Sequence, residues 1–209
     1  MEKLTLWVLL LAAPALTQEP ANLGVFEGSC DVGAPSHKGS VVFDQARREY
    51  RVTGGGANMW AKRDDFFFVW RKITGDVAVG ADMTIASGGA PHRKAGLMIR
   101  KSFEPDAVYA DAVVHGEGLT SLQFRDQAGD ITRGLRFPMQ GPTRIRLERR
   151  GIVVSMWTAA PGGAWQEAGS TEVRLGDPVY VGLAVCAHDD KAETTAVFSN
   201  LTIEKLEKR

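Results

Sequence analysis

The chain has 209 residues, a length that suits a single all-β sandwich domain, because such domains often exceed the usual length per domain without splitting. Lys and Arg together number 25, and so do Asp and Glu, so the formal net charge is zero. Since no net positive field draws the chain toward nucleic acid or an acidic membrane surface, we expect no nucleic-acid partner.

The first residues have the features of a secretory leader. Lys3 precedes an apolar run over residues 4–11 that is too short to span a bilayer, and small residues follow at 13–15. We therefore predict a signal peptide over residues 1–17, a single domain over 18–209, no transmembrane segment after cleavage, and a secreted or periplasmic location. Because the positive region is weak, a buried first strand is the alternative.

The two cysteines lie far apart in the sequence. In an oxidising compartment Cys30 and Cys186 can form a disulfide that joins the two ends of the domain. Cys186 lies within the apolar run 179–187, however, and can equally be a small buried hydrophobic residue. Both interpretations stay open, and neither cysteine has the neighbouring Cys or His residues of a zinc site.

The first strands are indicated by short apolar runs. Residues 40–43 and 49–52 flank a turn and predict a hairpin. Three glycines at 54–56 follow without the helix, Lys and Ser of a phosphate-binding loop, so they predict a bend or bulge. Residues 66–73 are apolar on both faces, which is typical of a central strand covered on both sides.

Residues 76–125 carry the clearest pattern in the chain, an apolar set that alternates with a polar set in four successive runs. A period of two is expected of strands that lie on a core. The apolar set is Val77, Val79, Ala81, Met83, Ile85, Ala95, Leu97, Ile99, Val108, Ala110, Ala112, Val114, Leu122 and Phe124. We expect a four-stranded meander with one face on the core and the other free to meet a ligand.

Further strands are predicted in the second half by runs that Gly and Pro separate. They cover residues 143–148, 152–158, 165–168, 178–187 and 194–203. Only residues 203–209 have a helix-like pattern. The predicted fold class is therefore an all-β sandwich of many strands.

Several segments together carry a resemblance to a known family, namely residues 55–60, 66–69, 92–100, 109–111, 115–119, 122–125 and 181–188. They resemble secreted bacterial domains of unknown function in the concanavalin A-like lectin/glucanase superfamily. The runs KAGLMIR at 94–100 and GLAVCAH at 182–188 are the most specific. The resemblance covers nearly all of residues 18–209 and implies a jelly roll of two curved antiparallel sheets. It also implies contact with extracellular carbohydrate, although a fold does not fix a function.

On a jelly roll the polar set would line the concave sheet. The candidate ligand-binding residues are Trp60, Arg100, Tyr109, Asp111, His115, Gln123 and Arg125. Planar Asp, Gln and Arg groups can make paired hydrogen bonds to sugar hydroxyls, and an aromatic ring can cover an apolar sugar face. The alternative is that Arg100 and Asp111 form a cross-strand ion pair that only keeps an open face soluble.

A hydrolase is the second hypothesis. Glycoside hydrolysis needs two carboxyl groups that flank the bond, and Glu104-Pro105-Asp106 lies in a predicted turn, without the final Glu of the superfamily's glucanases. Asp82 and Asp111 can act as acid and base if the sheet places them across a groove, with His115 assisting. A third hypothesis is an interaction domain that docks a protein of the cell envelope through the same face.

Metal ligands are sparse. His92, His115 and His188 each end a predicted strand, without ligand spacing between them. Asp189 and Asp190 are candidate calcium ligands, but they lack the regular acidic spacing of a calcium loop, and a solvated turn is the alternative. No other cofactor is expected. The favoured function is a non-catalytic, lectin-like domain that binds a glycan.

Overall fold

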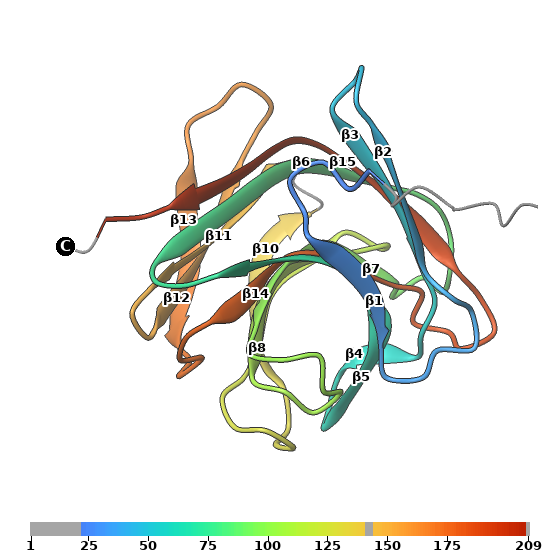
Figure 1. The fold of residues 1–209 in the computed structure, drawn as a ribbon, viewed down its shortest axis with the longest axis horizontal. Coiled ribbons are helices and arrows are strands. Elements are labelled where there is room, and N and C mark those ends of the chain that lie inside the picture. The colour runs from blue at the N-terminus through green and yellow to red at the C-terminus, as the bar shows by residue number, and fades with distance from the viewer. Residues whose placement is uncertain (1–21, 141–143, 208–209) are drawn as a thin grey trace, which may run out of the picture.

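The computed structural model describes residues 22–140 and 144–207, with no side-chain description at 138–140, and the predicted leader 1–17 lies outside these residues. The described residues form an all-β sandwich of two antiparallel sheets (Figure 1). The concave sheet has the order β1 (Gly28–Val32), β5 (Arg63–Ile73), β14 (Val179–Cys186), β7 (Lys94–Arg100), β8 (Tyr109–His115), β9 (Leu119–Arg125) and β10 (Arg133–Gln140), with β4 (Asn58–Trp60) paired to β5.

The second sheet, here called the outer sheet, lies against the convex side of the first. Its order is β13 (Gln166–Glu172), β12 (Val153–Ala159), β11 (Arg144–Arg150), β6 (Val77–Gly88), β15 (Thr194–Lys205), β3 (Glu49–Gly54) and β2 (Ser40–Asp44). In Figure 1 the concave sheet curls round from β8 to β1, while β6 and β15 cross outside it. The predicted all-β jelly-roll sandwich is confirmed.

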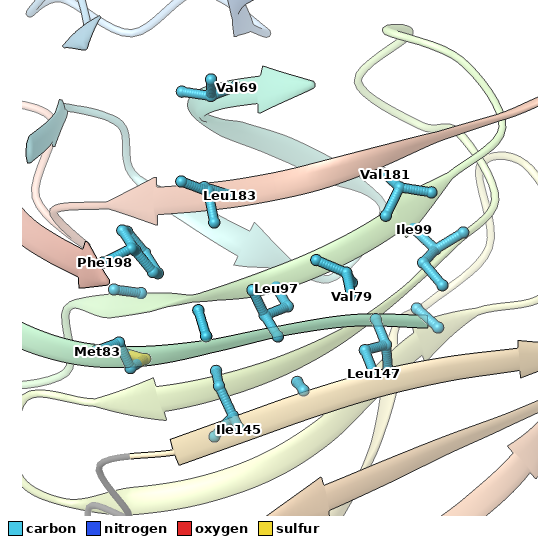
Figure 2. Packing of buried hydrophobic residues seen from close by; sticks show 14 of the residues in the cluster. Val69, Val79, Met83, Leu97, Ile99, Ile145, Leu147, Val181, Leu183 and Phe198 are labelled. Atoms are coloured by element: carbon cyan, nitrogen blue, oxygen red, sulfur yellow. The ribbon is translucent and has the colours of Figure 1, made fainter. Parts of the chain in front are cut away.

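The core between the two sheets is built by the apolar set that the sequence indicated. Val79 of β6, Leu97 and Ile99 of β7 and Leu183 of β14 are fully buried in one cluster (Figure 2). Side chains alternate across a strand, so each strand contributes every second residue to this core. The apolar parity predicted for residues 76–125 is therefore confirmed.

The expected four-stranded meander is wrong in its first strand. β6 pairs with β11 and β15 in the outer sheet, and the meander of the concave sheet runs through β7, β8, β9 and β10. The chain changes sheet after Gly88 and Gly89, both of which have positive φ angles. Alternation shows which side chains face a core, but not from which side of that core they come.

The predicted hairpin and central strand are confirmed. β2 pairs with β3, and β5 is buried on both faces, with Phe67 in the core between the sheets and Phe66 on the concave side. The bend at 54–56 is also confirmed: Gly56 has φ +100°, and a Cβ there would lie 2.0 Å from the Asp65 carbonyl oxygen. Only glycine lets the two backbones approach so closely.

The later strands form as predicted, but three other strands were missed. β1 and β4 are short, and β10 is exposed over residues 133–136, so none of them shows a clear alternating pattern. The helix-like reading of residues 203–209 is wrong where it is described, because β15 continues to Lys205. Within residues 22–140 and 144–207 no helix is long and apolar enough to cross a membrane.

The cysteines are free. Cys186 is buried, and its Sγ lies 3.4 Å from the carbonyl oxygens of both Gly56 and Asp65. Burial raises the pKa of the Cys186 thiol to about 12. Of the two interpretations that the sequence left open, the structure supports Cys186 as a small buried hydrophobic residue and shows no disulfide between Cys30 and Cys186.

Candidate ligand-binding site

The polar row of the concave sheet does not lie on an open face. Arg100, Tyr109, Asp111 and Arg125 are 0% exposed, so the expectation that these four line an accessible surface is wrong. The sheet curls, and the segments that follow β4, β7 and β9 close over it. Arg125, for example, donates hydrogen bonds to the carbonyl oxygens of Ala61, Ala107 and Asp130.

A buried carboxylate that the sequence did not single out organises this interior. Asp64 of β5 accepts hydrogen bonds from both terminal nitrogens of Arg125, at 2.8 and 3.0 Å, and lies 3.6 Å from Nη1 of Arg100. Burial raises the pKa of Asp64 and the two arginines oppose that effect; the paired hydrogen bonds are those of an ionised carboxylate. The alternative that Arg100 forms an ion pair with Asp111 is wrong, because Arg100 faces Asp64 instead.

Apolar side chains fill the rest of the concave interior. They come from β1, β4, β5, β7, β8 and β14 and form a second cluster of Val32, Met59, Phe66, Phe68, Met98, Tyr109, Val113, Ala184 and Cys186. The hydroxyl of Tyr109 lies 3.1 Å from Thr132 Oγ1. These residues hold the covering loops on the sheet, which is a structural role.

Asp111 lies beside this cluster without a hydrogen-bond partner for either carboxyl oxygen among the described residues. Burial raises its pKa well above the usual range, and the charge of Lys94 opposes that shift. Lys94 is 1% exposed, and Nζ donates to Asn58 Oδ1 at 2.8 Å and to the Met59 carbonyl at 3.2 Å. Burial also lowers the pKa of Lys94, an effect that Asp111 opposes.

One end of the concave side remains open as a pocket of about 140 Å³. Its lining comes from β4, β7, β8, β9 and β10 and the segments beside them: Asn58, Trp60, His92, Lys94, His115, Leu119, Ser121, Gln123, Gly134 and Arg136. Of the predicted ligand-binding residues, Trp60, His115 and Gln123 lie here.

Three of the other lining residues were missed because the two strands that carry them, β4 and β10, were missed. Asn58 lies on β4, directly after the glycine bend, and Gly134 and Arg136 lie on the exposed strand β10. Gly134 pairs with Gln123 across the strands and Arg136 pairs with Ser121, so both face the pocket. Residues 133–136 are all exposed, and Gly134 weakens a strand pattern further, so the sequence contains no clear signal for β10.

A chain of polar contacts fixes the hydrogen-bonding groups of the pocket. His115 Nδ1 lies 2.9 Å from the Leu119 carbonyl and must donate, which leaves Nε2 as an acceptor facing the Gln123 amide at 3.5 Å. The Gln123 amide nitrogen also donates to Ser121 Oγ at 3.1 Å, and its oxygen faces Lys94 Nζ at 3.5 Å. Burial lowers the pKa of His115 to about 4, so this imidazole is neutral at neutral pH.

Three histidines that are distant in the sequence meet at the edge of the pocket. The His92 ring lies 4.2 Å from the His115 ring and 4.9 Å from the His188 ring, measured between centroids. His92 Nδ1 also contacts the Glu117 carboxylate. Even so, the described part of the chain contains no group of three or more His, Cys, Asp or Glu side chains with the geometry of a metal site.

The candidate calcium residues lie in a turn and are engaged with nearby groups. Asp190 accepts hydrogen bonds from the Ser36 amide and hydroxyl, at 3.1 and 2.6 Å, and Asp189 accepts one from the Lys191 amide at 2.9 Å. Such contacts are those of carboxylates that order a loop. Calcium binding therefore stays a prediction, without a cluster of carboxylates to support it at this turn.

The candidate acid/base pair is not assembled. Asp82 lies on β6 in the outer sheet, where Oδ1 accepts a hydrogen bond from Arg144 Nε at 2.9 Å, and Asp111 lies within the concave sheet. Neither residue lines the pocket, and its lining contains no Asp or Glu among the residues described. Two carboxyl groups that flank a glycosidic bond are therefore not available there.

A second hollow, of about 420 Å³, lies on the outer sheet between the β2–β3 hairpin and β15. Although it is larger, two of its three arginines face carboxylates of their own, Arg47 with Asp44 and Arg144 with Asp82. Most of the charge in this hollow is therefore already paired, whereas the smaller pocket combines an aromatic ring with converging donors and acceptors.

Comparison with known proteins identifies the fold. No protein-family model matches the chain, and no curated protein sequence matches it. Among solved structures, a functionally unknown protein from Saccharomyces cerevisiae superposes with a TM-score of 0.66 at 14% identity, over 86% of this chain and 97% of that one. The carbohydrate-binding module CBM66 from Bacillus subtilis gives 0.54 at 15% identity, with the same coverages.

The GH43 protein BlXynB from Bacillus licheniformis is similar over part of its length. It superposes with a TM-score of 0.60 at 12% identity, over 90% of this chain and 38% of that one. At such identities these similarities show the fold alone, a jelly-roll sandwich. The resemblance to secreted bacterial domains is thus confirmed for the fold.

Proposed function

We propose that this protein is a secreted or periplasmic lectin-like domain that binds a single sugar residue of a glycan in the pocket beside Trp60. The observation that carries the proposal is the combination of one partly exposed aromatic ring with several converging polar groups in a small concave site. Sites for small polar ligands have this composition.

The size of the pocket argues for one ring. A cavity of about 150 Å³ accommodates one benzene molecule in a protein interior, and this pocket measures about 140 Å³. One pyranose or furanose ring therefore fills it, and a longer glycan has to continue into solvent. This supports recognition of the end or a side branch of a glycan, in place of an extended chain along an open sheet.

The chemistry of the lining suits a sugar. The Trp60 indole can cover the C–H face of a ring, while Asn58, Ser121 and Gln123 offer both donors and acceptors to hydroxyl groups. His115 adds an acceptor because its neutral tautomer is fixed by the Leu119 carbonyl. The shared fold of CBM66, a carbohydrate-binding module, is consistent with this use of the concave side.

The two other hypotheses lose support. Hydrolysis by a pair of carboxylates has no pair at the pocket, since Asp111 is buried and Asp82 lies in the outer sheet. Docking of an envelope protein through the concave face requires an open sheet, and the residues expected there are covered by loops.

A glycan array probed with the whole protein, followed by calorimetry, tests the proposal. For any glycan that binds, we expect Trp60→Ala to weaken affinity at least tenfold, because loss of the aromatic cover removes about 1.4 kcal/mol or more. Trp165→Ala is the matched control, since Trp165 is a half-buried tryptophan that stacks on Arg144 over the outer sheet. Equal binding by Trp60→Ala and the unchanged protein would refute the pocket, and release of sugar from the bound glycan would show turnover.

A further inference from the structure

The charge of the same pocket carries a narrower inference, which rests on the proposed function. We infer that the sugar residue bound beside Trp60 is an acidic one, whose carboxylate lies toward Lys94 and Arg136. The inference concerns the class of ligand, and it depends on which charges line the pocket and which of them are already matched.

Permanent charges in the lining are of one sign. Lys94 and Arg136 are cations, and no Asp or Glu lines the pocket among the described residues. Among the carboxylates that act on Lys94, Asp111 has the strongest effect and is buried, Glu117 contacts His92, and Asp64 contacts Arg125. A concave site that is lined by positive charges and has low-dielectric walls attracts an anion.

Lys94 brings a buried positive charge whose bonded partners are neutral. Its Nζ donates to an amide oxygen of Asn58 and a carbonyl oxygen of Met59, and it lies 5.3 Å from the centre of the Trp60 ring. Asp111 lies on the neighbouring strand, but its carboxyl makes no hydrogen bond to Lys94 or to any other described residue. The charge of Lys94 is therefore not cancelled by direct pairing with a carboxylate.

Arg136 supplies the second cation from the rim of the pocket. It is exposed, and within residues 22–140 and 144–207 it makes no hydrogen bond or salt bridge to a side chain that the structure describes. Arg133, three residues earlier on the same strand, lies on the other face and is paired with Asp126 at 2.6 Å. Arg136 is thus a guanidinium with room to make paired hydrogen bonds to a carboxylate.

The volume favours a carboxylate over a bulkier anion. A uronic acid replaces the hydroxymethyl group of a hexose by a planar carboxylate of nearly equal size, whereas a sulfate ester adds a tetrahedral group to the ring. A pocket of about 140 Å³ is filled by about one ring, so the smaller carboxylate suits it better than the bulkier sulfate. Gly134 keeps the pocket open beside Trp60, because a Cβ at this position would lie 3.4 Å from the Trp60 ring.

Calorimetry with matched sugars tests the inference. The probes are short oligosaccharides of galacturonic, glucuronic and mannuronic acid, each compared with its methyl ester, with its neutral hexose counterpart and with a sulfated hexose. We expect at least one acid to bind at least tenfold more tightly than its ester and its neutral counterpart, with an affinity that falls severalfold between roughly 20 and 300 mM salt as screening increases. Equal or tighter binding of the neutral or sulfated sugars would overturn the inference.

Three variants assign the effect to the pocket. Arg136→Gln should weaken binding of the acid about tenfold and leave any binding of the neutral sugar unchanged, whereas the control Arg133→Gln should change neither. Gly134→Val should abolish binding of both, because a branched side chain suits an exposed strand and fills the site. Unchanged binding of the acid by Arg136→Gln would contradict the role of its charge.

The outcomes also separate this inference from the function on which it rests. Neutral sugars that bind at least as tightly as the acids, and lose binding in Gly134→Val, would retain the pocket as a lectin site and overturn the acidic ligand. Binding of an acid that Gly134→Val does not affect would overturn both, as would a folded protein that binds no sugar on the array or in calorimetry.

Discussion

The two sides of the concave sheet are both closed from water, but they are closed in different ways. On the convex side, Leu97, Ile99 and Leu183 pack against the outer sheet in an apolar core. On the concave side, Arg100 and Arg125 are equally buried, around the carboxylate of Asp64. Successive residues of one strand thus enter two interiors of opposite character.

The two interiors gain their stability in different ways. An apolar core gains free energy in proportion to the area removed from water, without dependence on direction. A buried charge is tolerated only if its partners have good geometry, and removal of one partner leaves an uncompensated charge. Removal of one charged group from the concave interior should therefore lower the free energy of unfolding by more than the size of that group suggests.

The largest effect is expected at the centre of the polar interior. Asp64→Ala leaves Arg100 and Arg125 buried without their carboxylate, so we expect a loss of about 3–5 kcal/mol in the free energy of unfolding, measured by urea denaturation. Asp65→Ala is the control, because Asp65 is half-buried and its Oδ1 accepts a hydrogen bond from the Ala34 amide; that loss should be about 1 kcal/mol. Similar losses in the two variants would contradict a polar interior organised by Asp64.

The apolar core should respond next most strongly. Leu97→Ala removes buried methyl groups between the sheets and leaves a cavity, with an expected loss of about 3 kcal/mol. Leu97→Met conserves the volume and should cost less than about 1.5 kcal/mol. Urea denaturation measures both, and a loss in Leu97→Ala as small as that in Leu97→Met would mean that the core is loosely packed.

A fall in pH should lower the stability of the protein through His115, which lies on the concave side. The folded-state pKa of His115 is about 4, whereas the ordinary pKa of histidine is 6.5, so between these pH values the unfolded chain binds more protons than the folded protein. Stability contributed by neutral His115 is therefore complete above pH 6.5 and is lost as the pH falls toward 4, by up to about 3 kcal/mol.

The comparison of wild type with His115→Gln isolates this contribution from other titrating groups such as Asp111. The free energy of unfolding of the wild type, minus that of the variant, should be constant above pH 6.5 and should decrease down to pH 4. A difference that does not change with pH would show that His115 is not held neutral by burial.

The smallest effect is expected at an apolar residue that enters neither interior. Val42 of β2 is 63% exposed, so Val42→Thr should change the free energy of unfolding by no more than about 0.5 kcal/mol. Val52 of the paired strand β3 is fully buried, and Val52→Thr buries a hydroxyl at a cost of about 1–3 kcal/mol. Thermal or urea unfolding of the two variants checks this. Equal losses of stability in both would place Val42 in an interface that the single chain does not show.

Much of the candidate site could not be predicted from the sequence. His115 and Gln123 were found because a polar residue on a strand face is visible in the pattern, and Trp60 was found only as an aromatic residue able to cover a sugar face. Asn58, Gly134 and Arg136 were missed because β4 is three residues long and β10 is an exposed edge strand without clear alternation. The meeting of His92 with His188 depends on loops whose paths no local spacing determines.

The all-β class, most strands and the residues of the core between the sheets could be predicted from local sequence, because a period of two is a local property of each strand. Three features became visible in the folded chain alone: β6 belongs to the outer sheet, Asp64 pairs with Arg125, and most of the polar row is covered. Those outcomes depend on sheet curvature and on contacts between segments distant in the chain, such as the β4–β5 hairpin and the loops after β7 and β9. For that reason the polar alternation predicted a face correctly, while its burial and the position of the pocket followed from the fold.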